Sequence, residues 1–234
     1  NAVSSDTSCP VKDCMLSRPW QEYINNITKI VVDDGVTSIG SDAFNGLEAV
    51  TKVVLPDSLT QIGFGAFCRT AITEMTIPEK VSKLGFSAFY GCESLENVAF
   101  AGNELKEIEV YTFACCSNLK TLQIPEGITT FGTGAVQSCS SLEELVFPAS
   151  MTTLGRNGLA SYDANNPNTS LKKVVVKGAV AIPEYLFANC TSLETVDLCN
   201  AVTSIESRAF SNCSSLKSVD GMNAVTAIGD SAFR

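Results

Sequence analysis

Apolar residues return along the chain in a short motif, apolar-x-x-apolar-x-apolar, which is often followed by proline. The copies include Val50-x-x-Val53-x-Leu55-Pro56, Ile72-x-x-Met75-x-Ile77-Pro78, Leu119-x-x-Leu122-x-Ile124-Pro125, Leu142-x-x-Leu145-x-Phe147-Pro148 and, without the proline, Leu193-x-x-Val196-x-Leu198. The end of the motif alternates between apolar and polar positions, as a strand with one buried face requires. Proline has no N–H for a strand ladder and ends the strand. Each copy therefore predicts one short β-strand.

A second apolar pair with an adjoining glycine follows the strand motif. It occurs at Val36-Thr37-Ser38-Ile39-Gly40, Leu59-Thr60-Gln61-Ile62-Gly63, Val81-Ser82-Lys83-Leu84-Gly85 and Val225-Thr226-Ala227-Ile228-Gly229. Glycine permits a sharp turn at this point. The segment after the glycine is centred on an anchor residue, for which we expect one short helical turn. The anchors that follow alanine are Phe44, Phe67, Phe89, Phe210 and Phe233, and Phe113, Val136, Leu159 and Phe187 hold the equivalent place elsewhere.

Successive anchors are separated by 23, 22, 24, 23, 23, 28, 23 and 23 residues. A single unit of this length cannot bury its own apolar face, so units with a fixed period stack into a solenoid with a continuous core. We therefore expect an α/β solenoid of about nine coils, with parallel strands on a concave face and short strands or helical turns on the other side. Residues 27–234 would form this single domain, and the polar segment 161–168 would be a loop insertion in the long interval.

The repeated unit resembles the BspA-like class of leucine-rich repeats, whose pattern is L-x-x-I-x-I-P…V-T-x-I-G-x-x-A-F-x-x-C. The resemblance covers about Ile27 to Phe233 and departs from the pattern at Val136 and Leu159, at the insertion, and where proline is missing after Phe100, Val176 and Leu198. Met15, Pro19-Trp20 and Tyr23 resemble the N-terminal segment of these proteins, so residues 1–26 are expected to be a cap with Trp20 as its apolar plug. The resemblance implies a secreted or surface-anchored protein of host-associated microbes that adheres to host proteins or other cells, with no catalytic residue and no cofactor.

Composition narrows the chemistry that this chain can perform. It has no histidine, which excludes Ser-His and Cys-His nucleophiles and histidine metal ligands. The net charge is −9 and there is no basic run, so neither nucleic acid nor an anionic membrane surface is an expected partner. No stretch approaches the length of an apolar transmembrane helix. Neither a C-x-x-C pair nor an EF-hand loop is present. We therefore predict no enzyme, no cofactor and no metal site.

The two ends of the chain also carry expectations. Asn1–Ser5 has neither the charged nor the apolar region of a signal peptide, so either the protein is cytosolic or its signal peptide has been removed. Arg234 follows an Ala-Phe pair in mid-repeat, which predicts a truncated or uncapped C-terminus.

Five of the ten cysteines share one position, three residues after the anchor: Cys92, Cys116, Cys139, Cys190 and Cys213. A disulfide needs converging Cβ vectors, whereas side chains stacked in register run parallel. We therefore expect a column of buried, reduced thiols that packs one coil on the next. Cys9 and Cys14 lie in the expected cap, where a disulfide and two free thiols are equally consistent with the sequence.

The outward positions of the strands form two columns along the expected concave face. One column runs Val31, Val54, Thr76, Ala99, Gln123, Val146, Val175, Asp197 and Asp220, and the other runs Lys29, Lys52, Glu74, Asn97, Thr121, Glu144, Lys173, Thr195 and Ser218. Such faces are common binding surfaces in solenoids, although ordinary strand propensity on a solvated sheet explains the same residues. A third column, three residues before the anchor, carries Phe64, Phe86 and Val110, which form either an exposed apolar strip or locally packed side chains.

These patterns favour a secreted or cell-surface module that binds a host or microbial surface protein, or a glycan, and that has no catalytic activity. The alternative is a structural spacer within a larger surface protein. Screening against extracellular-matrix proteins and glycans separates the two hypotheses.

Overall fold

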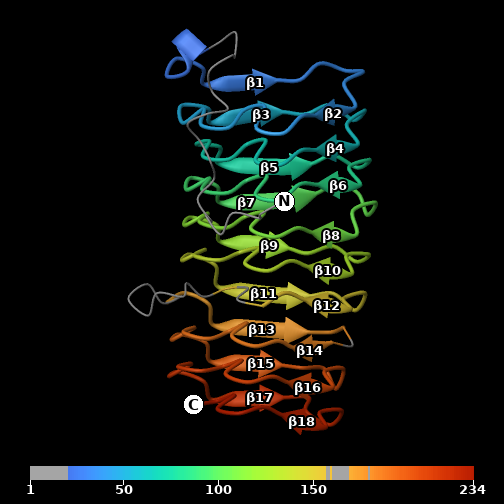
Figure 1. Cartoon of the computed structure of the whole chain (residues 1–234), viewed down its shortest axis with the longest axis vertical. Coiled ribbons are helices and arrows are strands. Elements are labelled where there is room, and N and C mark those ends of the chain that lie inside the picture. The colour runs from blue at the N-terminus through green and yellow to red at the C-terminus, as the bar shows by residue number, and fades with distance from the viewer. Residues whose placement is uncertain (1–20, 157–158, 160–168, 179) are drawn as a thin grey trace, which may run out of the picture.

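The computed structural model describes residues 21–156, 159, 169–178 and 180–234. The chain winds into a stack of coils, and each coil contributes one strand to a long side and one two-residue strand to a short side (Figure 1). A 3₁₀ turn, η1 (Gln21–Tyr23), precedes the stack. The long-side strands are β1 (Lys29–Val31), β3 (Lys52–Val54), β5 (Glu74–Ile77), β7 (Asn97–Phe100), β9 (Thr121–Gln123), β11 (Glu144–Phe147), β13 (Lys173–Val176), β15 (Thr195–Asp197) and β17 (Ser218–Asp220). The short-side strands are β2 (Ser38–Ile39), β4 (Gln61–Ile62), β6 (Lys83–Leu84), β8 (Glu107–Ile108), β10 (Thr130–Phe131), β12 (Thr153–Leu154), β14 (Ala181–Ile182), β16 (Ser204–Ile205) and β18 (Ala227–Ile228).

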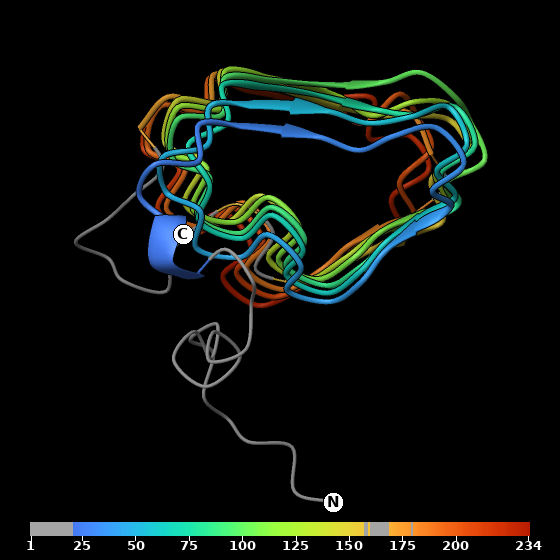
Figure 2. The same ribbon diagram turned by 90° about the horizontal axis from the view of Figure 1, so that it is seen from above.

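All pairings between coils are parallel and follow the repeat. On the long side, β1 pairs with β3, and β5 to β17 form a seven-stranded sheet in coil order. Lys29 lies opposite Lys52 and Glu74 opposite Asn97, one repeat apart in each case. Seen from above, the coils superpose around a common interior (Figure 2). The expected solenoid of parallel strands is confirmed, with about eight complete turns between the first and last long-side strands and a ninth coil begun by β17 and β18.

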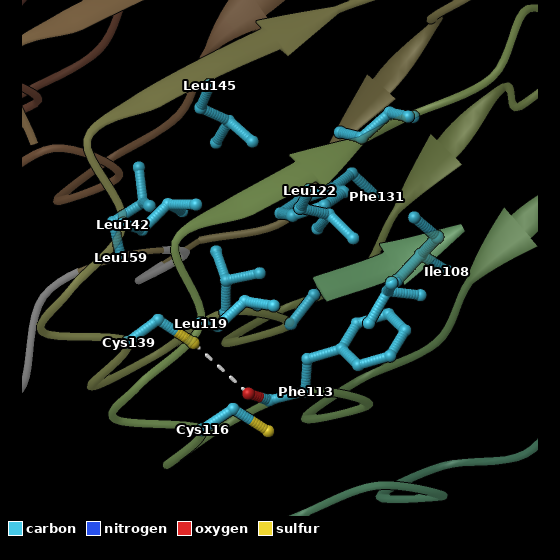
Figure 3. Close-up of a cluster of buried hydrophobic side chains, with 14 of the residues drawn as sticks. Ile108, Phe113, Cys116, Leu119, Leu122, Phe131, Cys139, Leu142, Leu145 and Leu159 are labelled. Carbon is cyan, nitrogen blue, oxygen red and sulfur yellow. Dashed lines mark hydrogen bonds between the residues drawn. The ribbon is translucent and has the colours of Figure 1, made fainter. Parts of the chain in front are cut away.

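The anchor phenylalanines fill the interior. Phe67, Phe89 and Phe113 are fully buried, and their rings stack with centroids 5.4 Å and 5.5 Å apart from one coil to the next. Figure 3 shows Phe113 among the leucines and isoleucines that line this core. Where the anchor is Val136, Phe131 and Phe147 are buried instead and meet edge to face at 5.2 Å, which supplies ring volume close to a smaller anchor.

The expected helical turn at the anchor is wrong. Apart from η1, the described part of the chain contains no helix, and the anchor segments are hydrogen-bonded turns. The residues two before and two after the anchor have positive φ, for example Ser87 (54°) and Gly91 (69°). Their N–H groups, and that of the anchor, point to the next coil: Phe89 N donates to Thr112 O at 2.9 Å. These bonds between coils replace the i→i−4 bonds that a helix would make.

The repeat-position thiols also join successive coils. Cys92 Sγ donates to Phe67 O at 3.1 Å, Cys116 Sγ to Phe89 O at 3.3 Å, and Cys139 Sγ to Phe113 O at 3.2 Å (Figure 3). Cys190 is buried and Cys213 is half-buried, and all eight cysteines of the described residues are free thiols. Cys9, Cys14 and the insertion at 161–168 lie outside the described residues, as does the expected cap up to residue 20.

Candidate interaction surfaces

The two outward columns of the long side lie in register, as their spacing in the sequence predicts. Val31 pairs with Val54, Val146 with Val175, and Asp197 with Asp220. Val31 is 55% exposed and Val54 is 41% exposed, whereas Val146 and Val175 are half-buried. Thr76, Gln123, Glu74 and Glu144 are exposed as well. The exposed valines of this face therefore lie at its N-terminal end.

A ladder of ion pairs covers the rest of this face. It begins one residue before the strands, where Glu96 meets Lys120 at 2.7 Å, Glu143 meets Lys172 at 3.1 Å and Glu194 meets Lys217 at 2.6 Å. Within the strands, Glu144 meets Lys173 at 2.8 Å. The Lys217 ammonium lowers the pKa of Glu194, and a hydrogen bond to Glu144 raises the pKa of Lys173. Each of these four lysines therefore faces a carboxylate of the neighbouring coil.

The first two coils differ from this arrangement. Among the described residues, neither Lys29 nor Lys52 has a carboxylate within ion-pair distance, and both are exposed. The two lysines flank the exposed Val31 and Val54 in adjacent strands. We call Lys29, Val31, Lys52 and Val54 the Lys–Val patch. Sequence reasoning placed these residues on one face but missed the ion-pair ladder, whose signal is the alternation of Glu and Lys at the repeat spacing.

The aromatic strip lies on a different flank, beside the short-side strands. Phe64 and Phe86 stack with centroids 5.4 Å apart and ring planes 13° apart, and Phe86 meets Tyr111 edge to face at 5.8 Å. Phe86 is 40% exposed, while Phe64, Val110 and Tyr111 are half-buried. The strip is therefore partly open to solvent, and its third ring is Tyr111, next to the predicted Val110.

Two hollows accompany these surfaces. One, of about 410 Å³, adjoins the aromatic strip and is lined by residues of β2, β4 and β6 and the turns that follow them. The other lies on the anchor turns, where Arg69, Glu93, Tyr90 and Cys115 face it. Burial, followed by a hydrogen bond with the Cys115 thiol, raises the pKa of Tyr90 to about 12. Tyr90 therefore stays protonated at neutral pH and offers hydrogen bonding only.

In the described part of the chain, no three His, Cys, Asp or Glu side chains are grouped so that they would hold a metal ion. Nor does that part contain a helix whose length and apolar character would take it across a bilayer.

Comparison with known proteins agrees with the repeat and its geometry. A family model described as BspA type leucine-rich-repeat region matches in six copies, over residues 21–143 and 106–234. The chain belongs to this family. The resemblance drawn from the repeated motif is thereby confirmed, and the BspA-type repeats account for nearly every described coil. No curated protein matches the sequence.

Solved structures with the same fold come from several bacteria. A leucine-rich-repeat protein of T. pallidum is 23% identical over 81% of this chain and 78% of its own, with a TM-score of 0.56. The pneumococcal vaccine antigen PcpA is 21% identical over 86% of this chain and 58% of its own, with a TM-score of 0.51. A leucine-rich cell surface protein of Faecalibacterium prausnitzii is 24% identical, with a TM-score of 0.45; the match covers 83% of this chain and 59% of that protein.

Proposed function

We propose that this BspA-type chain is a secreted or surface-displayed binding module without catalytic activity, and that its Lys–Val patch contacts an acidic, partly apolar surface on a host or microbial protein. The observation that carries the proposal is a contrast within one face. Four lysines at or beside the later strands of this face are paired with glutamates: Lys120, Lys172, Lys173 and Lys217. Lys29 and Lys52 have no such partner in the described residues and flank two exposed valines.

A surface with exposed apolar side chains beside unpaired charged side chains is suited to binding another protein. Burial of the two valines against a partner contributes a hydrophobic gain, and the lysines select a partner of opposite charge and speed its approach. The placement on a parallel strand ladder holds the four side chains in a fixed array, which limits the entropy lost on binding. Membership of a family with a cell-surface neighbour supports an extracellular location for this contact.

The test is a pair of variants that remove equal charge from the same face. Lys29→Gln with Lys52→Gln removes the two lysines of the patch, and Lys120→Gln with Lys217→Gln removes two lysines that are paired with Glu96 and Glu194. Binding to a panel of immobilised extracellular-matrix proteins is measured at low and high salt. We expect the first variant to bind the strongest panel member about tenfold more weakly and to lose most of its salt dependence. The control variant should bind like the unaltered chain.

Equal loss in both variants would show that overall charge, and not the patch, governs binding. Val31→Ser with Val54→Ser should weaken binding without changing its salt dependence, because it removes apolar contact and no charge. If the unaltered chain binds no member of the panel, the proposal fails and the structural-spacer hypothesis is favoured.

A further inference from the structure

Among the rings of the described residues, only Phe86 stacks on Phe64, and it occupies one face of that ring. Phe86 covers one face of Phe64 at 5.4 Å, so the opposite face points toward the first coil. The first coil has Ser41 at the position that Phe64 and Phe86 occupy in the second and third coils. The ring column therefore stops one coil before the described strands do, because β2 of the first coil lies beyond it, above β4 in Figure 1.

The hollow beside the strip begins at this uncovered face. Its lining includes Ser38, Gly40, Ser41, Gln61, Phe64 and Lys83. The part of this hollow that is lined by Ser41 and Phe64 is the place that a further ring of the column would fill. We call it the Phe64 slot.

The side chains around the slot decide which kind of ring it accepts. Ile39 and Ile62 are 5% and 0% exposed, so the apolar surface beside the slot comes from Phe64 and Phe86. The remaining side chains are largely polar: Ser38, Ser41, Gln61 and Lys83 are all exposed, and Glu109 also lines the hollow. A phenyl ring has no hydrogen-bonding group to offer these polar side chains. A sugar ring offers one face of C–H groups to an aromatic ring and a rim of hydroxyls to polar side chains.

The charge of the ligand follows from the same residues. Lys83 and Glu109 contribute one positive and one negative charge to the hollow, so a strongly charged ligand would gain at one and lose at the other. We propose that the Phe64 slot binds a neutral pyranose ring of an oligosaccharide, with its C–H face on Phe64 and its hydroxyls within reach of Ser38, Ser41, Gln61 and Lys83. This site is separate from the Lys–Val patch and does not depend on it.

The C-terminal coils contain a natural comparison. A hollow at the same position of the repeat is lined by Glu184, Ser204, Glu206 and Ser207 but by no aromatic side chain. It has the polar rim without the ring platform and carries two carboxylates. The proposal therefore predicts that this second hollow binds no neutral sugar.

The test fills the slot without touching the fold. Ser41→Phe adds the missing ring at an exposed position, which should cover Phe64 and leave the melting temperature unchanged or higher. Ser207→Phe makes the same change in the C-terminal coils as the matched control. Saturation-transfer NMR is recorded with cello-, chito-, manno- and galacto-oligosaccharides. We expect transfer to ring C–H protons of one series in the unaltered chain and in Ser207→Phe, and at least tenfold weaker transfer in Ser41→Phe and Phe64→Ser.

The outcomes separate the alternatives. Undiminished sugar binding by Ser41→Phe, or no transfer to any of the four series, would overturn the proposal. Transfer to N-acetyl-tyrosinamide alone, abolished by Ser41→Phe, would assign the slot to an aromatic side chain of a protein and overturn it as well. Lys29→Gln with Lys52→Gln should bind the sugars like the unaltered chain. The proposal for the Phe64 slot and the proposal for the Lys–Val patch are therefore tested independently.

Discussion

At the scale of single residues, the buried anchor side chains contribute much of the stability of the coils. Each buried anchor contributes its own apolar area. Phe67, Phe89 and Phe210 also stack on an anchor ring in the coil before and in the coil after, which ties each of them to two neighbouring coils. The loss of one anchor in mid-stack therefore leaves a cavity that backbone shifts cannot close, because the coils on both sides are fixed by strand pairing.

Phe89→Ala should lower the free energy of unfolding by about 3–5 kcal/mol through this cavity. Phe233→Ala is the matched control, because Phe233 is 42% exposed and stacks on Phe210 alone among the described rings. Its cost should be about 1 kcal/mol or less. Urea unfolding followed by circular dichroism measures both values. Similar costs for the two variants would contradict a stability that depends on burial within the column.

Most of the repeat-position thiols lie in a setting that disfavours ionisation. Cys92 differs: burial acts to raise its pKa, but hydrogen bonds with Cys116 and Thr70 lower the pKa overall. Burial raises the pKa of Cys116 and Cys190 well above the ordinary range, and it raises the pKa of Cys213 to about 12. A neutral thiol keeps the proton that it donates to the anchor carbonyl of the preceding coil. The column therefore serves packing, which agrees with its regular place in the repeat.

What the sequence could predict differs from residue to residue. Phe89 and Cys92 recur at a fixed spacing, and their burial followed from that spacing alone. The exposure of Phe64 and Phe86 could not be predicted from their spacing. It depends on the side chain that the adjacent coil presents, which is Ser41 on one side and an edge-on Tyr111 on the other. The turn at the anchor was mistaken for a helix because alanine and phenylalanine suit a helix locally, while the hydrogen bonds that decide the backbone run between coils.

At the scale of the elements, the glycine that follows six of the nine short strands in the described residues permits successive coils to approach closely. A Cβ atom on Gly63 would lie 2.6 Å from Ser41 N, and one on Gly85 would lie 2.6 Å from Phe64 N. Both contacts involve backbone atoms, which cannot rotate away as a side chain can. The glycine thus permits the close approach of successive turns. The sequence motif shows that a glycine recurs here, but not which backbone atom of the preceding coil it approaches.

Gly63→Ala should destabilise the chain by about 1–3 kcal/mol, because the added methyl group forces two coils apart. Gly40→Ala is the control at the equivalent position of the first coil, where a Cβ atom meets no described atom within 4 Å. It should be neutral or slightly stabilising, since alanine restricts the unfolded chain. Thermal melts of the two variants, followed at the same wavelength, provide the comparison. A Gly40→Ala variant that melts as low as Gly63→Ala would show that glycine is needed for another reason.

At the scale of the whole molecule, surface chemistry changes along the stack while the core does not. The long-side face runs from the Lys–Val patch, through the ion-pair ladder, to Asp197 and Asp220. The outward columns in the sequence already indicated an apolar beginning and an acidic end. They could not indicate which lysines are neutralised, because that depends on distances between side chains of different coils. Core positions repeat because every coil meets the same neighbours, and this leaves outward positions free to differ.

A stack held by nearest-neighbour contacts should tolerate the loss of one whole unit. Deleting residues 73–95 joins Ile72 to Glu96, which occupies the place of Thr73 in the repeat, and brings Phe113 to the usual spacing from Phe67. The shortened chain should fold cooperatively, with a urea m-value lower by about a tenth because less surface is exposed on unfolding. Deleting residues 73–84, half a unit, is the control: it places short-side residues opposite long-side strands and should abolish the far-UV β signal. If the whole-unit deletion also fails to fold, stability depends on contacts beyond adjacent coils, and the stack is not the sum of its repeats.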